Sequence, residues 1–225
     1  MSDPWVFGYA SLMWHPGFAH AEAVHARLPG FHRALCVYSV HYRGTSARPG
    51  LVFGLDQGGA CDGMAFRIAA DDWLAGLRYL HGRELVTGAY RPERHAVRLR
   101  DGSGRAPRAL CYVADHRARQ YAAGHTPAEQ AAIVRESRGA HGRNIDYVLA
   151  TARHLHELGI RDREIERLTT LLGLQWRVRA ESDTCRASAA SHRDLGAVVV
   201  PRRRRVAPLP AMAALRHALA RRIRD

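Results

Sequence analysis

The sequence predicts an α+β fold, with strands in the first half of the chain and helices in the second. Three observations support this prediction. Short apolar runs separated by Pro or Gly fill much of residues 1–115, one helical period interrupts them, and capped helical periods dominate from residue 126 onward. The chain has 225 residues, of which 47% are apolar, so it is long enough to build one domain with a proper core.

The expected strands are rich in Val, Phe, Tyr, Leu and Cys, and turn-forming residues bound them. The first is WVFGY, and it ends in Gly and Tyr. In chain order the expected strands cover residues 5–9, 31–42, 51–56, 61–69, 93–100 and 107–115. Because these runs precede most of the helices, a wound parallel α/β sheet is not expected.

Four helices are expected from periodicity and capping signals. The first covers 71–84, with Asp71 as its N-cap. The second opens with the capping box Thr126-Pro127-Ala128-Glu129, where Pro occupies the first helical position, and it runs to about residue 138. The third begins at Asn144 and stops at Gly159, and the fourth runs from Asp162 to near Gly173.

The periodic pattern is lost after Trp176, so we expect a domain over 1–176 and an Arg-rich, disordered tail over 177–225. All 34 basic residues are arginines, and the tail holds 12 of them against 4 acids, a net charge of +8 out of +13. Two interpretations stay open. The tail is an unselected extension, or it binds nucleic acid or another anionic surface.

Cysteine and histidine spacing indicates neither a disulfide framework nor a metal site. No histidine falls in an HExxH pattern. The four cysteines are widely spaced, at Cys36, Cys61, Cys111 and Cys185. The first residues lack a basic n-region, and no apolar run approaches 18 residues. We therefore expect a reduced, cytoplasmic protein that uses no metal and does not enter a membrane.

Glu84 is the residue that the helical pattern does not explain. Trp73, Leu77 and Leu80 form one apolar stripe, and Glu84 is the next position on it. Burial and the helix C-terminus both raise a carboxyl pKa, toward the range useful for a general base. The alternatives are a buried glutamate paired with an arginine and a helix that frays before residue 84.

Three loops could also contribute to a site. In residues 7–17, FGYASLMWHPG, a strand ends in a turn of small residues whose backbone N–H groups could hold an anion or an oxyanion. An ordinary β-turn is the alternative. Residues 39–50 look like a structured loop around Arg43, and 137–148 lead into a helix N-terminus. Either could be scaffold only.

Taken together, these segments resemble a known family. The order VFGYASLMWHPGF, HYRGT, CDGMAFRI, RELVTGAY, LCYVAD, GRNIDYVLAT and ELGIRD is similar to that of the ChaC-type γ-glutamylcyclotransferases. The resemblance runs from about Trp5 to Leu172. It implies a small mixed β-barrel with surrounding helices and cleavage of glutathione to 5-oxoproline and cysteinylglycine, without a cofactor. The expected partner is then a small-molecule substrate, glutathione. No membrane partner is expected, nucleic acid is the less favoured partner, and either a monomer or a dimer is open.

The resemblance also implies roles for individual residues. Glu84 corresponds to the family's catalytic glutamate and is expected to act as general base and then acid. The family's γ-glutamyl loop matches Tyr9-Ala10-Ser11-Leu12, flanked by Gly8 and Met13, and Tyr147 matches a tyrosine near the pocket. One departure is Ala10, where the family usually has glycine. If that position needs a positive φ, alanine costs about 1 kcal/mol or more.

Three functional alternatives follow from these residues. The first is glutathione cleavage, and the second is the same cyclisation on other γ-glutamyl amines or peptides. The third is an inactive protein, with a loop spoiled at Ala10 or with anion binding through the tail.

Overall fold

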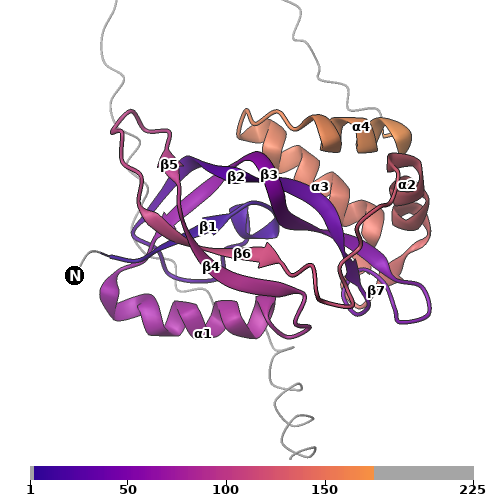
Figure 1. Ribbon diagram of the computed structural model, residues 1–225, viewed down its shortest axis with the longest axis horizontal. Helices are drawn as coiled ribbons and strands as arrows, with labels where there is room; N and C mark the ends of the chain where they lie inside the picture. The colour runs from indigo at the N-terminus through magenta and orange to yellow at the C-terminus, as the bar shows by residue number, and fades with distance from the viewer. Residues whose placement is uncertain (1–2, 175–225) are drawn as a thin grey trace, which may run out of the picture. The chain divides into compact units, whose positions relative to one another are not determined.

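The computed structural model describes residues 3–174, and they form one curled mixed sheet with four α-helices (Figure 1). The strands are β1 (Trp5–Gly8), β2 (Glu22–Ser39), β3 (Gly50–Arg67), β4 (Tyr90–Ala96), β5 (Arg98–Leu99) and β6 (Arg108–Ala114), with a small β7 (Arg138–Gly139) and β8 (Gly142–Arg143) hairpin. The helices are α1 (Trp73–Glu84), α2 (Pro127–Glu136), α3 (Asn144–Glu157) and α4 (Arg163–Leu171), and the 3-10 turns are η1 (Ser11–Met13) and η2 (Ala70–Asp72). The expected α+β class is therefore correct.

The main sheet has the strand order β4-β6-β1-β3-β2-β5. β1 runs antiparallel to β3 and parallel to β6, while β2 and β3 form a long antiparallel pair. β3 also pairs directly with β6, through Leu55 and Val113, although β1 lies between these two strands over part of their length. This extra pairing curls the sheet into a half-barrel.

Three of the predicted strands correspond to two longer strands in the structure, because turn-forming residues were interpreted as strand ends. The structure has one 18-residue strand, β2, where only 31–42 was expected, and a second, β3, that joins the expected 51–56 and 61–69. The β2–β3 register shifts next to Gly30, and Gly58 and Gly59 have φ of 99° and 65°. These glycines form an irregularity inside the paired strands, where an extra residue is accommodated by positive φ.

The helix predictions were closer. Thr126 and Glu129 make the expected capping box, and Asp162 caps α4 by accepting from the Ile165 N–H at 3.2 Å. The prediction for Asp71 was wrong. Residues 70–72 form the η2 turn, and α1 begins at Trp73 with Asp72 as N-cap and no side-chain capping bond.

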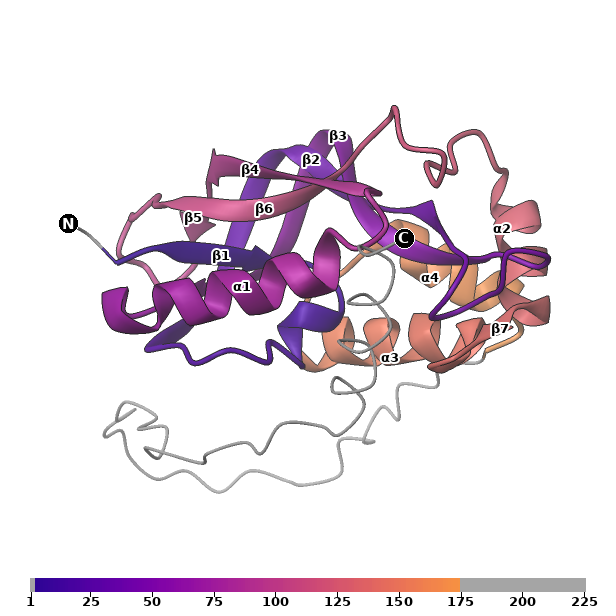
Figure 2. The ribbon, with the colours of Figure 1, turned by 90° about the horizontal axis from the view of Figure 1, so that it is seen from below.

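The sheet separates two apolar layers. On one side, Leu80 of α1 packs with Val6 of β1 and with Leu110 and Tyr112 of β6. On the other side, α3 and α4 pack against Phe7, Phe53 and other inward residues. Figure 2 shows α1 running alongside β1, whereas α2, α3 and α4 gather elsewhere on the sheet. The end of β1 therefore lies where the loop that follows it can reach both layers.

Three further predictions concern the cysteines, the membrane and the C-terminal tail. Cys36, Cys61 and Cys111 are buried and free, which confirms their role as small core residues. No helix within residues 3–174 is long and apolar enough to cross a membrane. The expected domain boundary at 176 and the Arg-rich tail at 177–225 lie outside the described residues.

Candidate active site

The loop that follows β1 turns tightly because its first residue has no side chain. A Cβ on Gly8 would lie 3.0 Å from the Leu12 Cβ and 3.2 Å from the Phe66 ring, closer than ordinary contact. The Met13 N–H donates to the Ala10 carbonyl at 2.8 Å and closes the η1 turn. Gly8 thus lets the chain fold back, and the expected loop of residues 8–13 is one compact unit.

Ala10 does not carry the strain that a left-handed residue would. Its φ is −137°, outside the positive region that favours glycine. Its methyl group is buried in the core cluster, where it joins the aromatic and thioether side chains of Tyr9 and Met13. The penalty considered for alanine at a positive φ therefore does not apply.

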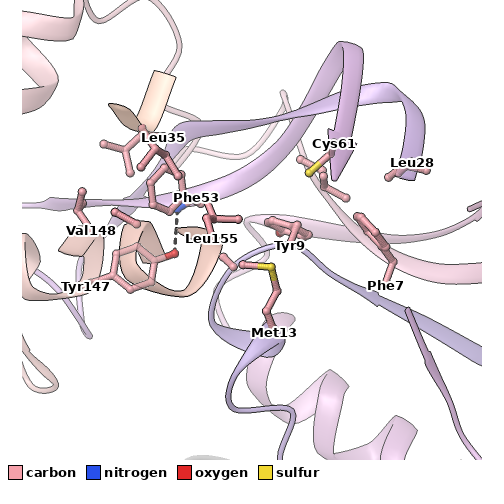
Figure 3. Close-up of a cluster of buried hydrophobic side chains, with 14 of the residues drawn as sticks. Phe7, Tyr9, Met13, Leu28, Leu35, Phe53, Cys61, Tyr147, Val148 and Leu155 are labelled. Atoms are coloured by element: carbon pink, nitrogen blue, oxygen red, sulfur yellow. Dashed lines mark hydrogen bonds between the residues drawn. The ribbon is translucent and has the colours of Figure 1, made fainter. Parts of the chain in front are cut away.

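The loop reaches into the layer that faces α3. Figure 3 shows Tyr9 and Met13 of the loop together with Tyr147 of α3 in one buried cluster. The Trp14 ring lies 4.6 Å from the His154 ring of α3, measured between centroids. These contacts join the two segments that the sequence resemblance singled out, although they are more than 130 residues apart.

Glu84 is the last residue of α1, so the helix does not fray before it. Its side chain is only 16% exposed, and its Oε1 lies 3.0 Å from the Arg83 Nε. Burial raises the pKa of the Glu84 carboxyl, and the Arg83 charge and hydrogen bond lower it by less, so the net shift is upward. The carboxyl is thus paired with arginine and still has the raised pKa expected for a general base.

Arg83 joins this carboxylate to the loop. Its Nη2 donates to the Ser11 Oγ at 2.7 Å, and its Nη1 donates to the His15 carbonyl at 2.8 Å. Because the same guanidinium contacts Glu84, any movement of the loop is coupled to the end of α1. This connection was not predicted.

The Glu84 charge acts on four tyrosines, of which Tyr90 is half-buried and the other three are buried: Tyr9, Tyr90, Tyr112 and Tyr147. In each, burial is the main cause of a raised pKa, and the Glu84 charge adds to it. For Tyr147 the pKa rises to about 12. All four hydroxyls therefore stay protonated near neutral pH, so the Glu84 charge acts on neutral phenols.

Three of these hydroxyls are held in place by the backbone. Tyr9 donates to the Tyr112 carbonyl at 3.0 Å, and Tyr90 donates to the Phe53 carbonyl at 2.9 Å. The Tyr147 hydroxyl accepts from the Phe53 N–H at 3.2 Å, as Figure 3 shows. The Tyr112 hydroxyl is different, because it is buried and has no hydrogen-bond partner among residues 3–174. A group in that state favours a ligand or water that can accept from it.

Comparison of the sequence with known proteins shows the family to which the chain belongs. A family model described as ChaC-like protein matches residues 4–175. The chain belongs to the ChaC-like family. It is 33% identical over 158 residues to the Escherichia coli glutathione-specific γ-glutamylcyclotransferase, which covers 70% of the chain and 68% of the relative. It is 31% identical to the human glutathione-specific γ-glutamylcyclotransferase 1, with 66% and 68% covered.

A solved structure shows the same fold as this ChaC-like chain. It is a glutathione-specific γ-glutamylcyclotransferase from yeast, which matches with a TM-score of 0.68 at 22% identity. The match covers 77% of the ChaC-like chain and 96% of the yeast chain. The expected fold, a small mixed sheet closing toward a barrel with helices around it, is confirmed.

The structure brings most of the predicted site residues of this ChaC-like chain into one region. Tyr9, Ala10, Met13 and Tyr147 share a core cluster, while Leu12 packs in the layer under α1. Ser11 is linked to Glu84 through Arg83, whose guanidinium contacts both side chains. Within residues 3–174, no group of three His, Cys, Asp or Glu side chains could hold a metal ion. The absence of any cofactor stays a prediction.

Sequence reasoning missed a buried arginine that supports the loop. Arg33 of β2 is 3% exposed, and its Nε donates to the Tyr9 carbonyl at 2.5 Å. Its other nitrogens bind Asp162 at the start of α4 and the Asp62 carbonyl. The available signal was an arginine two positions before the buried Leu35 in an apolar strand. Its partner Asp162 lies 129 residues away, which no local pattern reveals.

Proposed function

We propose that this ChaC-like chain cleaves glutathione to 5-oxoproline and cysteinylglycine, with Glu84 as the general base. A buried carboxyl with a raised pKa, at the end of a helix and coupled by Arg83 to a compact loop, carries this proposal. The curated relatives named glutathione-specific γ-glutamylcyclotransferase support the choice of substrate. The partner is then a small molecule, and a cytoplasmic location stays a prediction.

The reaction removes two protons from the α-nitrogen. Glu84 takes the first from the α-ammonium of the γ-glutamyl group and passes it to solvent, and the freed nitrogen attacks the γ-carbonyl carbon. Glu84 then takes the second proton from the attacking nitrogen and delivers it to the cysteine nitrogen as the bond from the γ-carbon to that nitrogen breaks. The nucleophile and the electrophile belong to one molecule, so the site mainly has to fold the substrate into an attack geometry.

The loop of residues 8–13 and Tyr147 would provide that geometry. The γ-glutamyl group would bind to this loop, in which Tyr9, Ala10 and Met13 share a core cluster with Tyr147. The loop residues proposed to bind it are Gly8, Tyr9, Ala10, Ser11, Leu12 and Met13. Backbone N–H groups of this loop would stabilise the oxyanion that forms on the γ-carbonyl oxygen. The protonated Tyr112 and Tyr147 hydroxyls, which donate to no group in residues 3–174, would supply neutral donors without competing as bases.

The test is 5-oxoproline release from glutathione by the full chain and by Glu84→Gln. We expect kcat/KM to fall by roughly 10²–10⁴-fold, since the variant keeps the shape of the side chain but loses the base. The matched control is Glu22→Gln, the same change at a glutamate paired with arginines outside the site, and it should keep the wild-type rate. Circular dichroism and thermal unfolding check that all three proteins fold.

Two results would contradict the proposal in different ways. A folded Glu84→Gln protein that releases 5-oxoproline at the wild-type rate would show that Glu84 is not the base. A folded wild-type protein that releases none would remove glutathione as substrate. Assays on γ-glutamyl amino acids and other γ-glutamyl amines would then test the second alternative.

A further inference from the structure

The β2–β3 connection holds an arginine that the proposed reaction does not yet use. This loop is built without spare room: a Cβ on Gly44 would lie 2.1 Å from the Gly50 nitrogen, and one on Gly139 would lie 2.5 Å from the Tyr42 backbone. The Arg43 N–H donates to the Ser39 Oγ at 3.0 Å. The loop therefore packs closely against the β7–β8 hairpin, and the backbone of Arg43 has a fixed position.

The guanidinium of Arg43 is also held. Its Nη1 donates to the His141 carbonyl at 2.6 Å and lies 3.5 Å from the Arg143 carbonyl. Its Cζ lies 5.4 Å from the centroid of the Tyr147 ring, over the face of that ring. Two carbonyls and an aromatic face thus orient the cation. The Arg43 Nε and Nη2 atoms make no hydrogen bond to residues 3–174.

Arg43 has no ion-pair partner within residues 3–174, unlike the shielded Arg33 and Arg83. Arg33 pairs with Asp162 and Arg83 pairs with Glu84, while Asp146, whose charge acts on Arg43, lies 3.8 Å from the Arg143 Nε instead. Burial lowers the pKa of Arg43, while the charge of the nearby Asp146 acts in the opposite direction. A half-buried, oriented guanidinium with two unused donor positions matches the geometry of a carboxylate ligand.

Tyr147 connects this cation to the candidate active site. Its ring lies beneath Arg43, and its hydroxyl is held by the Phe53 N–H in the core cluster. The pKa of Tyr147 is raised chiefly by burial and further by Glu84, while Arg43 lowers it. The Tyr147 ring belongs to the same core cluster as Tyr9 and Met13, so it connects Arg43 to the loop that follows β1.

We propose that Arg43 binds the carboxylate at the C-terminal end of the substrate, which in glutathione is the glycine carboxylate. This inference rests on the proposed function. The α-amine and α-carboxylate of the γ-glutamyl group share one carbon, so both must lie close to Glu84. The second carboxylate is on the leaving group, many bonds away. Glu84 is paired with Arg83, whereas Arg43 lies over the Tyr147 ring with unused donors, so Arg43 fits that distal carboxylate and would be a specificity-determining residue.

The experiment compares two substrates in three proteins. The substrates are glutathione and glutathione whose glycine carboxylate is an amide, and the proteins are wild type, Arg43→Met and Arg48→Met. Arg48 is an exposed arginine of the same loop, so its variant removes an equal charge without touching Tyr147. The readouts are kcat and KM for 5-oxoproline release and the melting temperature of each protein.

We expect wild type to prefer glutathione over its amide by roughly 10–100-fold in kcat/KM, mainly through KM. Arg43→Met should lose this preference: kcat/KM falls roughly 10–100-fold for glutathione and less than about threefold for the amide. Arg48→Met should keep the wild-type preference. Arg43→Lys should recover only part of it, because lysine keeps the charge without the planar pair of donors.

Other outcomes overturn the inference and are distinct from failure of the proposed function. Equal losses on both substrates would show that Arg43 supports the loop or binds the α-carboxylate. Unchanged kinetics in Arg43→Met would show that it binds nothing in this reaction. If folded wild type releases no 5-oxoproline from either substrate, the proposed function fails, and this inference fails with it.

Discussion

Glu84 and Glu22 both have arginine partners at similar distances, yet their pKa values move in opposite directions. Glu84 lies 3.0 Å from the Arg83 Nε, and Glu22 lies 2.7 Å from Arg105 and 2.9 Å from Arg67. Hydrogen bonding from Arg105 is the largest cause that lowers the pKa of Glu22, whereas burial raises the pKa of Glu84. An arginine partner alone therefore does not distinguish a structural carboxylate from a catalytic one.

The surroundings explain the difference better than exposure does. The two side chains are 16% and 26% exposed, which is a small gap. Glu22 stands at the start of β2 and receives two arginines, each of which also binds another acid, Asp3 or Asp101. Glu84 has one arginine partner within residues 3–174, and its charge raises the pKa of four tyrosines. With fewer charged partners and more protein around it, its desolvation cost outweighs the ion pair.

The largest effect on this comparison should come from Arg83→Met, which removes the single charge that lowers the pKa of Glu84. We expect kcat/KM at pH 7 to fall by roughly 10–100-fold. The base must be deprotonated to act, so activity rises with pH through the pKa of Glu84. A further rise of that pKa moves the acid limb of the kcat/KM profile to higher pH, which a pH series on glutathione measures.

Ser11→Ala is the matched control for Arg83→Met. It removes the hydrogen bond between Arg83 and the loop but leaves Arg83 beside Glu84. Its activity can fall, but its acid limb should stay at the wild-type pH. An Arg83→Met profile with an unmoved or lowered acid limb would show that Arg83 does not set the pKa of Glu84.

Local sequence signals predicted the ends of helices well where one or two residues determine where the helix begins or ends. The box of Thr126 and Glu129 placed the start of α2, and the apolar stripe led to Glu84 as the end of α1. The lengths of β2 and β3 were not predictable in this way. Gly30 and Gly58 look like strand ends in the sequence, and only the pairing of two long strands turns them into an irregularity inside a sheet.

The site was predictable only as far as its chemistry is local. Glu84 was found because a carboxylate interrupts an apolar stripe, and the loop was indicated by its small residues, while the role of Tyr147 came from the family resemblance. Arg33 and Tyr112 were missed, and the loop around Arg43 was noted without a role for the arginine, since their contacts depend on residues far away in the chain. Arg43, for example, meets the His141 carbonyl 98 residues later. A sequence shows such an arginine but not whether its partner is an acid, a carbonyl or a ligand.

A smaller effect should appear in the stability of Glu84→Gln. The folded pKa of Glu84 is raised, so the folded state is favoured when the carboxyl is protonated, and this contribution is lost as pH rises from about 4.5 through the folded value. The amide has no charge to desolvate. We expect its melting temperature at pH 7 to exceed that of wild type by a few degrees, and the gap to close below about pH 4.5. Calorimetry across this pH range checks the sign, and a less stable variant at pH 7 would contradict it.

The smallest effect should come from Glu22→Gln, and its sign should be the reverse. The folded pKa of Glu22 is lowered, so its contribution to stability is present above about pH 4.5 and is lost as pH falls through the folded value. The ion pairs of Glu22 with Arg67 and Arg105 are partly exposed to solvent. We therefore expect the variant to lose about 1 kcal/mol or less of unfolding free energy at pH 7, and less still in 1 M salt. Chemical unfolding at two salt concentrations measures this loss. If Glu22→Gln were instead stabilising at pH 7, the two glutamates would differ only in degree, and the raised pKa of Glu84 would no longer set it apart as the base.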